Sequence, residues 1–286
     1  MTITITTSNV NGIRAAKRKG IEDWAGKHAP DVWCIQEVRA PQDDVDSIFD
    51  EFGFEYATAG KIEAPANLHA MNEVCRVKGR AGVGLLTDLE VLDKRYGLPG
   101  LSEDVDSGRW IETDVKTPEG YAITVASVYV HAGNTDYPTK MEQKYRFLDT
   151  MLKRMGALRD EAAHGGKQAV LCGDFNIAHT PLDIKNAKAN EKHAGFLPEE
   201  RAYVDKWLDE YEFVDVMRSL AGDIQGPYTW WSQRGRAFDN NVGWRIDYQF
   251  ATPELAETAC GFVIDKAPTY DLRWSDHAPL SIMYDI

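Results

Sequence analysis

The chain has 286 residues, and its 45 Asp and Glu outnumber its 32 Lys and Arg, which gives a formal net charge of −13 with neutral histidines. With 43% hydrophobic and 27% charged residues it has the composition of an ordinary globular protein, which argues against disordered, fibrous and membrane classes. Its 4 cysteines form no Cys-x-x-Cys pair, so neither a zinc ribbon nor a disulfide framework is indicated, and a reducing compartment suits them. Without a signal-peptide pattern, repeat or linker, we expect one intracellular domain over residues 1–286.

Hydrophobic periodicity predicts alternating strands and helices along the chain. In the first part we predict strands over 2–10, 31–36, 81–87, 109–115 and 121–130, and helices over 15–28, 42–52 and 139–163. Residues 117–120 form a hairpin-turn pattern between two of these strands. In the second part we predict a strand over 168–173, a helix over 198–210, short strands near 214, 230, 246 and 262, and a last strand over 278–284. This order lacks the regular βα period of a Rossmann or barrel protein and favours an α/β sandwich with mixed sheets and helices covering the outer faces.

Polar clusters stand at the ends of several predicted strands. They are Asn9 and Asn11 after the first strand, Glu37 after the second, Asp174 and Asn176 after the strand over 168–173, and Asp247 and the pair Asp276 and His277 beside later strands. If residues 174–176 are extended, Asp174 and Asn176 point to the same side and Phe175 points into the core. Taken singly, each cluster is better explained by turn formation or capping than by a functional site. Together, they predict polar side chains gathered in a cleft.

The residue types in these clusters favour a hard divalent cation. Carboxylates, amides and one imidazole, without a Cys ligand or a His-x-x-His pair, suit Mg²⁺ or Mn²⁺ better than zinc. Such a metal usually works on phosphates. Phosphodiester cleavage needs an oriented water, neutralised phosphate oxygens and a stabilised leaving oxygen. An aspartate paired with the histidine would fix its tautomer and raise its pKa.

The charge distribution qualifies the acidic total. A net charge of −13 argues against a polyanionic partner, because contacts to phosphates need Lys and Arg. Three segments, the basic windows, carry a net positive charge: +4 over residues 11–20, and +2 over each of residues 73–82 and 230–245. Solvated helix faces explain any one window equally well. Their position beside the polar clusters favours contact with phosphates.

Five ordered motifs between residues 9 and 277 carry a resemblance to a known family. They are Asn-Val-Asn-Gly-Ile-Arg-Ala at 9–15, Ile-Gln-Glu at 35–37, Gly-Asp-Phe-Asn-Ile-Ala-His at 173–179, Asn-Val-Gly-Trp-Arg-Ile-Asp-Tyr at 241–248 and Ser-Asp-His at 275–277. This set resembles that of the exonuclease III family, the apurinic/apyrimidinic (AP) endonucleases of base excision repair. The resemblance implies the endonuclease/exonuclease/phosphatase fold, an α/β four-layered sandwich of two mixed β-sheets flanked by helices.

The resemblance also implies roles for individual residues. The metal, Mg²⁺ or Mn²⁺, would be bound by Glu37, with Asn11 and Asp276 nearby. The residues that would carry out the reaction are Asp174, which activates water, Asn176 and Asn9, which arrange it, His277, which contacts the scissile phosphate, Asp247, its carboxylate partner, and Tyr129 on the phosphate side.

The substrate pocket implied by the resemblance is apolar. Trp230, Trp244 and Ile246 would accept a sugar without its base, which is cheap to flip out because no stacking or pairing is lost. Core packing would explain the tryptophans equally well without the neighbouring motifs. Arg234 would enter the duplex near the lesion, unless it is a solvated loop residue. His193 stands where relatives commonly have asparagine, and we expect it, with His131, to affect the cleft and substrate choice.

The resulting expectation is a divalent-metal-dependent DNA repair phosphodiesterase. It would cleave 5′ to abasic sites and act as a 3′-to-5′ exodeoxyribonuclease and 3′-end-cleaning phosphodiesterase or phosphatase. Its partner would be double-stranded DNA with abasic sites or 3′ ends. We expect a monomer without membrane contact, cytoplasmic as in bacteria and nucleoid-associated when on DNA. Two alternatives stay open: a same-fold phosphatase acting on inositol lipids or small phosphate esters, and a catalytically silent DNA-binding module.

Overall fold

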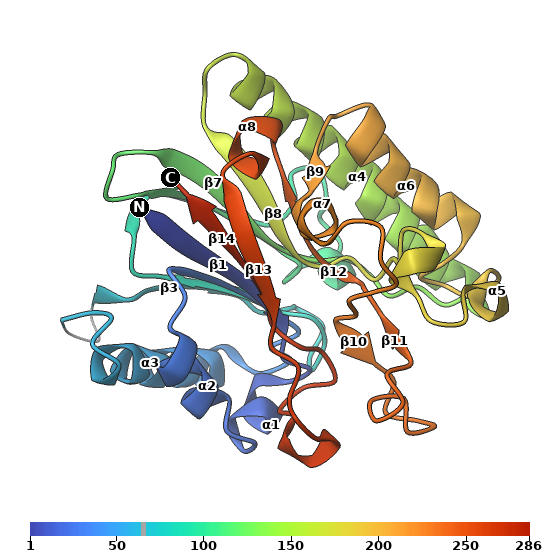
Figure 1. Ribbon diagram of the computed structural model, residues 1–286, viewed down its shortest axis with the longest axis horizontal. Coiled ribbons are helices and arrows are strands. Elements are labelled where there is room, and N and C mark those ends of the chain that lie inside the picture. The colour runs from blue at the N-terminus through green and yellow to red at the C-terminus, as the bar shows by residue number, and fades with distance from the viewer. Residues whose placement is uncertain (64–66) are drawn as a thin grey trace.

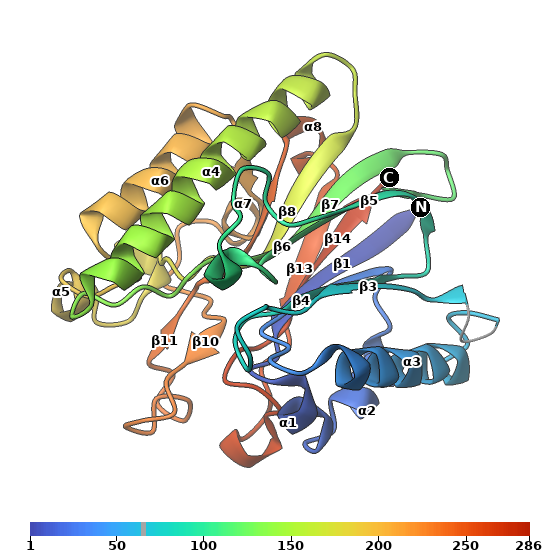
Figure 2. The ribbon, with the colours of Figure 1, turned by 180° about the vertical axis from the view of Figure 1, so that it is seen from behind.

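Two six-stranded sheets pack face to face, with helices on both outer faces (Figures 1 and 2). The computed structural model describes residues 1–63 and 67–286. The first sheet has the order β13 (Ala259–Ile264), β14 (Leu280–Asp285), β1 (Thr2–Asn9), β2 (Val32–Gln36), β4 (Val83–Thr87) and β3 (His69–Glu73). The second has the order β5 (Glu90–Tyr96), β6 (Trp110–Lys116), β7 (Ala122–Tyr129), β8 (Gln168–Asp174), β12 (Asp247–Ala251) and β9 (Val214–Asp215). The predicted four-layered sandwich is confirmed.

The helices divide between the two outer layers. The first sheet is covered by α1 (Ile13–Lys17), α2 (Ile21–His28) and α3 (Gln42–Thr58), and the second by α4 (Pro138–Ala163) and α6 (Pro198–Asp209). Shorter elements are α5 (Ala187–Asn190), α7 (Val216–Ala221), α8 (Pro253–Ala256) and a ribbon of β10 (Trp230–Trp231) and β11 (Gly243–Trp244). No helix in the described residues is long and apolar enough to cross a membrane.

The central strands are apolar on both faces because both faces are covered. In β2, Val32 and Cys34 belong to the core between the sheets, whereas Trp33 and Ile35 pack under the helices of the first layer. This alternation follows from the two-residue period of a strand. It explains why the predicted strands over 31–36 and 168–173 read as continuous apolar runs.

Each sheet contains one parallel pair at its centre, and these pairs place the polar clusters. β1 runs parallel to β2, with Asn9 opposite Gln36, and β7 runs parallel to β8, with Tyr129 opposite Asp174. The carboxyl ends of parallel strands lie at the same edge. β12 runs antiparallel to β8 and begins there, with Asp247 opposite Asp174. Residues distant in the sequence therefore meet at one end of the sandwich.

Several predicted boundaries were wrong for identifiable reasons. The helix predicted over 15–28 is two helices, broken before Gly20, whose φ of +86° is left-handed. α3 continues past the predicted end at residue 52, and its buried Tyr56 shows that the apolar face continues too. β3 and β5 were missed because they are edge strands with mostly polar, exposed residues. The predicted hairpin turn is present between β6 and β7, where the Thr117 amide donates to the Tyr121 carbonyl over 2.8 Å.

Candidate active site

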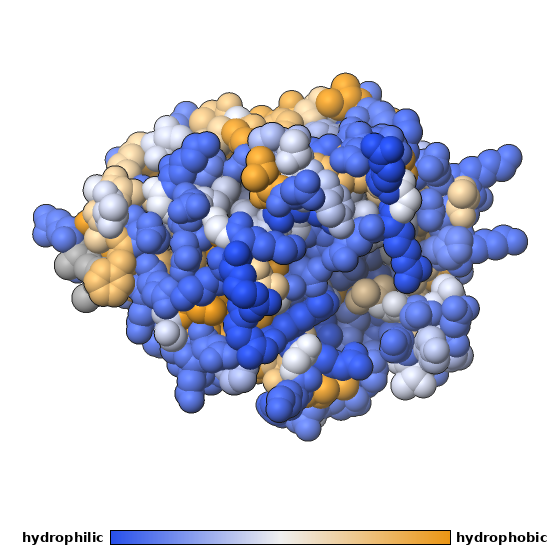
Figure 3. Space-filling model, turned by 90° about the horizontal axis from the view of Figure 1, so that it is seen from below, coloured by the Kyte–Doolittle hydropathy of each residue, from blue (hydrophilic) through white to orange (hydrophobic). Residues whose placement is uncertain are grey.

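A cavity of about 350 Å³ lies where these strand ends meet. Most of the predicted site residues line it: Asn9, Asn11, Glu37, Tyr129, Asp174, Asn176, Trp230, Trp244, Ile246, Asp276 and His277. The molecule seen from this end presents mainly hydrophilic side chains around a hollow (Figure 3). Asp247 lies behind the lining and reaches the cavity through His277.

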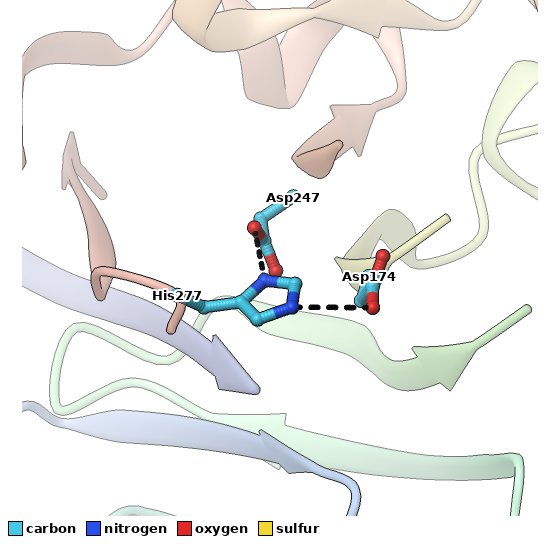
Figure 4. Close-up of side chains that lie close together, drawn as sticks. All are labelled: Asp174, Asp247 and His277. Carbon is cyan, nitrogen blue, oxygen red and sulfur yellow. Dashed lines mark hydrogen bonds and ion pairs between the residues drawn. The ribbon is translucent and has the colours of Figure 1, made fainter. Parts of the chain in front are cut away.

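His277 stands between two aspartates (Figure 4). Its Nδ1 is 2.8 Å from Oδ2 of Asp247, and its Nε2 is 3.8 Å from Oδ2 of Asp174. Burial alone would lower the pKa of His277, but the carboxylates of Asp247 and Asp174 outweigh burial and raise it to about 10. The imidazole is therefore a cation at neutral pH, with Nδ1 donating to Asp247 and Nε2 directed toward the cavity.

Two amides hold the carboxylate of Asp174. Asn9 donates from Nδ2 to Oδ2 over 2.9 Å, and Asn176 donates from its backbone amide to Oδ1 over 2.9 Å and from Nδ2 to Oδ2 over 3.2 Å. Burial raises the pKa of Asp174 to about 7, with the charge of Asp247 adding to the rise and His277 opposing it. Asp174 is a fixed carboxyl group that changes protonation state near neutrality.

The extended backbone expected after these strands is absent. Asn11 has φ +46° and Asn176 has φ +51°, so the chain makes a sharp turn immediately after each strand. Asparagine tolerates the left-handed region, and its side chain still reaches back to the strand end. Glu37 has φ +57°, which is uncommon for glutamate and is a form of strain found at functional sites.

A chain of polar contacts connects Glu37 to Asp276. Oε1 of Glu37 accepts from the Tyr129 hydroxyl, and Oε2 lies 2.6 Å from Nη2 of Arg39. Arg39 also donates from Nη1 to Oδ1 of Asn11 over 2.6 Å, and Asn11 donates from Nδ2 to Oδ1 of Asp276 over 2.8 Å. Sequence reasoning missed Arg39, although a cation two residues after the predicted metal-binding glutamate was a signal.

The donors on this side of the cavity fit a divalent cation. Glu37 and Asp276 supply carboxylates and Asn11 an amide oxygen, which are the ligand types that Mg²⁺ and Mn²⁺ take. The guanidinium of Arg39 bridges the oxygens of Glu37 and Asn11, so these groups already attract a cation. Each carboxylate has about four lone-pair sites, which leaves capacity for a metal.

A second group of possible metal ligands combines two carboxylates with an imidazole. One ligand atom from each of Asp174, Asp247 and His277 lies within 4.8 Å of the others. A protonated imidazole has no lone pair for a metal, and Nδ1 of His277 is already bonded to Asp247. Because Nδ1 of His277 is bonded to Asp247, the oxygen donors of Glu37, Asn11 and Asp276 are the better match to a hard divalent cation.

An aromatic wall closes another side of the cavity. Trp230 lies opposite Trp244 in the β10–β11 ribbon, with ring centroids 5.9 Å apart at 87°. Trp230 also donates from Nε1 to Oδ2 of Asp276 over 3.2 Å. A Cβ added to Gly195 would come within 2.9 Å of the Trp244 ring, so only glycine allows this close approach. The wall is directly joined to the polar residues.

Three residues expected to affect the cleft or contact the substrate do not line the cavity. His193 is exposed, and the cavity is lined by its neighbours Ala194 and Gly195. His131 is buried outside the cavity, 2.8 Å from Asp106, and burial lowers its pKa to about 2. The expectation that His131 affects the cleft was therefore wrong, and contact between the exposed His193 and the substrate stays a prediction. Arg234 lies in an exposed loop after β10.

The three basic windows have different environments. In the first, Arg14 pairs with Asp44 and Lys17 with Glu51, both on α3, so the acidic helix offsets part of that charge. In the third, Arg245 is buried. Lys19 of the first window lines a hollow that shares Asn11 and Asp276 with the cavity. The window over 73–82 sends cations to a second hollow of about 360 Å³ beside the cavity. That hollow is lined by Lys78, Arg80, Arg39 and Arg109, together with Glu37 and Tyr129 from the cavity itself.

Comparisons with known proteins identify the family of the chain. The model of the endonuclease/exonuclease/phosphatase family matches residues 6–277. The chain is 30% identical to an exodeoxyribonuclease of Bacillus subtilis over 97% of its own length and 98% of the relative's. It is 32% identical to the DNA repair nuclease APEX1 of Danio rerio over 97% of this chain and 81% of the relative. An AP endonuclease from Archaeoglobus fulgidus superposes with a TM-score of 0.80 at 28% identity, covering 99% of this chain and 100% of that one.

Proposed function

Because the chain belongs to the endonuclease/exonuclease/phosphatase family, we propose that it is a divalent-metal-dependent phosphodiesterase of DNA repair. Its substrate would be double-stranded DNA, cut 5′ to abasic sites and processed at 3′ ends. The observation that carries this proposal is the pairing of an amide-held Asp174 with a protonated His277 in one cavity. That the protein acts as a monomer in the cytoplasm stays a prediction.

Asp174 is the proposed general base. Asn9 and Asn176 fix both of its oxygens, so the carboxylate faces the cavity in one orientation. With a pKa of about 7, it holds a negative charge above neutral pH and is a stronger proton acceptor than an ordinary aspartate. It would orient a water molecule and take its proton as the water attacks phosphorus.

His277 is the proposed contact of the scissile phosphate. Its Nε2 hydrogen would be donated to a nonbridging oxygen, and its charge would stabilise the negative charge that develops there. Asp247 holds the ring through Nδ1 and keeps it protonated. Tyr129 would hold Glu37 at the phosphate side through its hydroxyl.

The cation is proposed to be Mg²⁺, with Mn²⁺ as a substitute. Glu37, Asn11 and Asp276 would hold it, because their oxygen donors converge on one side of the cavity. When bound, such a cation neutralises phosphate charge and stabilises the leaving oxygen. Arg39 would then share the Glu37 carboxylate with the cation or give up its ion pair with Glu37. Because Arg39 also lines the basic hollow, it could contact a phosphate there.

The dimensions of the cavity favour a sugar without its base. About 350 Å³ bounded by Trp230, Trp244 and Ile246 offers an apolar slot beside the catalytic groups. An abasic nucleotide loses no stacking or pairing when it flips out, so it enters such a slot at low cost. The adjoining basic hollow would receive a neighbouring phosphate of the same duplex.

A substrate panel tests the proposal. Labelled duplexes that are intact, nicked, 3′-phosphorylated or abasic at one position are incubated with Mg²⁺ or with EDTA, beside an inositol phosphate. We expect Mg²⁺-dependent cleavage of the abasic duplex and processing of the 3′ ends. Hydrolysis of the inositol phosphate alone would replace the proposal with a small-ester phosphatase, and binding without any hydrolysis would indicate a silent DNA-binding module.

A further inference from the structure

A fully buried ion pair lies beneath the cavity, and the roles assigned above make no use of it. Nζ of Lys144 on α4 is 2.5 Å from Oε1 of Glu200 on α6, and both side chains are 0% exposed. Removing two charges from water carries a desolvation penalty that an apolar pair would avoid. Stability alone is therefore a weak reason for charges at this place, and the directions of their hydrogen bonds are informative.

Lys144 donates hydrogen bonds to three separate parts of the chain. Besides Glu200, Nζ donates to the carbonyl of Ala132 over 3.2 Å and to the carbonyl of Asn176 over 2.9 Å. An ammonium group has three donors and no acceptor, so each hydrogen is used. Lys144 thus binds the segment after β7 and the segment after β8 at once.

Glu200 extends this connection to a third segment. Its Oε2 accepts from the amide of Gly195 over 2.6 Å and from the amide of Leu197 over 3.0 Å. Ala132, Asn176 and Gly195 all line the cavity. One ion pair therefore joins three backbone segments that form the cavity wall.

These segments leave little room for adjustment. A Cβ on Gly133 would come within 2.8 Å of the sulfur of Met141, on the same helix as Lys144. A Cβ on Gly195 would come within 2.9 Å of the Trp244 ring and 3.2 Å of the Asn176 carbonyl. A displacement of Gly195 would therefore move both the aromatic wall and the residue that holds Asp174.

We propose that Lys144 and Glu200 form a positioning pair for the nuclease site. The pair fixes the backbone at Asn176 and at Gly195, so the Asn176 amides remain directed at Asp174 and Trp244 keeps its place. This inference rests on the proposed function for its kinetic consequence. Its structural consequence, the joint anchoring of three segments, does not depend on the proposed function.

The kinetic test removes both charges together, so that neither is left buried and alone. In Lys144→Met/Glu200→Gln, the anchors on Ala132 and Asn176 are lost, and the neutral glutamine oxygen accepts more weakly from the amides of Gly195 and Leu197 than the carboxylate does. At saturating abasic duplex, kcat should fall on the order of 100-fold, the cost of a misplacement of about 1 Å, with little change in DNA affinity. Glu200→Gln alone keeps both carbonyl contacts of Lys144 and should give an intermediate kcat.

The matched control is Arg154→Met. Arg154 pairs with Glu112 over 2.6 Å, its partner is 2% exposed, and neither residue lines the cavity. A merely structural role would make the two sites equivalent, each variant losing stability and keeping kcat when folded. A kcat in the charge-free double variant equal to that of the Arg154→Met control would overturn the inference.

Hydrogen exchange supplies the readout that needs no DNA. In the double variant, amides over 130–133, 174–178 and 193–197 should all exchange faster than in the wild type, and those of the Arg154→Met control should not. Unchanged exchange over these three segments would contradict the inference, whatever the kinetics. If the wild type cleaves no DNA, the proposed function fails and the exchange result alone decides the inference.

Discussion

Two side chains 3.8 Å apart, Asp174 and His277, require opposite protonation states for the proposed reaction. Burial raises the pKa of Asp174 to about 7, and neighbouring carboxylates raise that of His277 to about 10. Between these values the aspartate is charged and accepts a proton while the imidazolium donates a hydrogen bond. The local environment thus separates two roles within one small cluster.

Asp247→Asn should displace the pH dependence of kcat/KM. The Asp247 carboxylate raises the pKa of His277, so its removal lowers that pKa and moves the alkaline limb to lower pH. The same charge raises the pKa of Asp174, so the acid limb should move down as well. A pH profile measured with an abasic duplex checks this. An alkaline limb in the same place as that of the wild type would disprove the role of Asp247.

Glu37→Ala should weaken cation binding. The variant removes a carboxylate from the oxygen cluster and frees Arg39 to contact Asn11 alone. Titration of the protein with Mn²⁺, followed by electron paramagnetic resonance, measures the affinity without DNA. The Mg²⁺ concentration for half-maximal cleavage should rise in parallel. Identical titrations for variant and wild type would place the cation elsewhere.

At the scale of elements, two parallel strand pairs bring the site together. β1 with β2 and β7 with β8 end at the same edge, and β12 and β14 begin near it. A buried ion-pair network anchors the β10–β11 ribbon. In this network, Arg245 lies 2.6 Å from Asp183 and 2.7 Å from Asp215. Arg245 sits between Trp244 and Ile246 in the sequence, so this network holds the apolar wall in place.

Asp183→Ala should destabilise the protein strongly. Arg245 is 0% exposed, and loss of Asp183 leaves its charge with Asp215 alone. Breaking a buried ion pair typically costs about 3–5 kcal/mol. The free energy of unfolding from urea titration measures the effect. The control Asp239→Ala removes an exposed pair with Arg236 and should change stability little. Equal stabilities for the two variants would be inconsistent with a structural role for the network.

Sequence reasoning identified the cavity residues whose positions follow from strand periodicity or from the family motifs. Glu37, Asp174 and His277 stand at or just beyond strand ends, so their meeting follows from the order of strands in two sheets. Arg39 was missed because its contact depends on left-handed backbone at both Glu37 and Arg39. Lys144 and Glu200 were missed because their contact arises from the packing of two helices, 56 residues apart in sequence, which no local pattern encodes.

At the scale of the whole molecule, the acidic chain gathers cations beside its cavity. The net charge is −13, yet Lys78, Arg80, Arg39 and Arg109 converge on one hollow. Acidic side chains elsewhere, such as Asp44 and Glu51 on α3, pair with nearby cations. A polyanion would therefore be repelled by most of the surface and attracted to the face that carries the site.

Lys78→Ala and Arg80→Ala should each weaken DNA binding and reduce its salt dependence. A side chain that neutralises one phosphate contributes about 0.9 to the slope of log affinity against log salt. Fluorescence anisotropy with a labelled duplex over a salt series measures that slope. Lys153→Ala, on the exposed side of α4, is the control and should leave it unchanged. Equal slopes for all three variants and the wild type would exclude the hollow from the DNA interface.

Turnover of a duplex containing one stable abasic analogue, compared between wild type and Asp174→Asn, tests the central claim most directly. The wild type should cut at the lesion with Mg²⁺ and stop with EDTA. The variant keeps the shape of the side chain but loses the proton acceptor, so its kcat should fall about 10²- to 10⁴-fold while it still binds the duplex. Equal turnover by the two proteins, or an intact duplex after incubation with the wild type and Mg²⁺, would contradict the account.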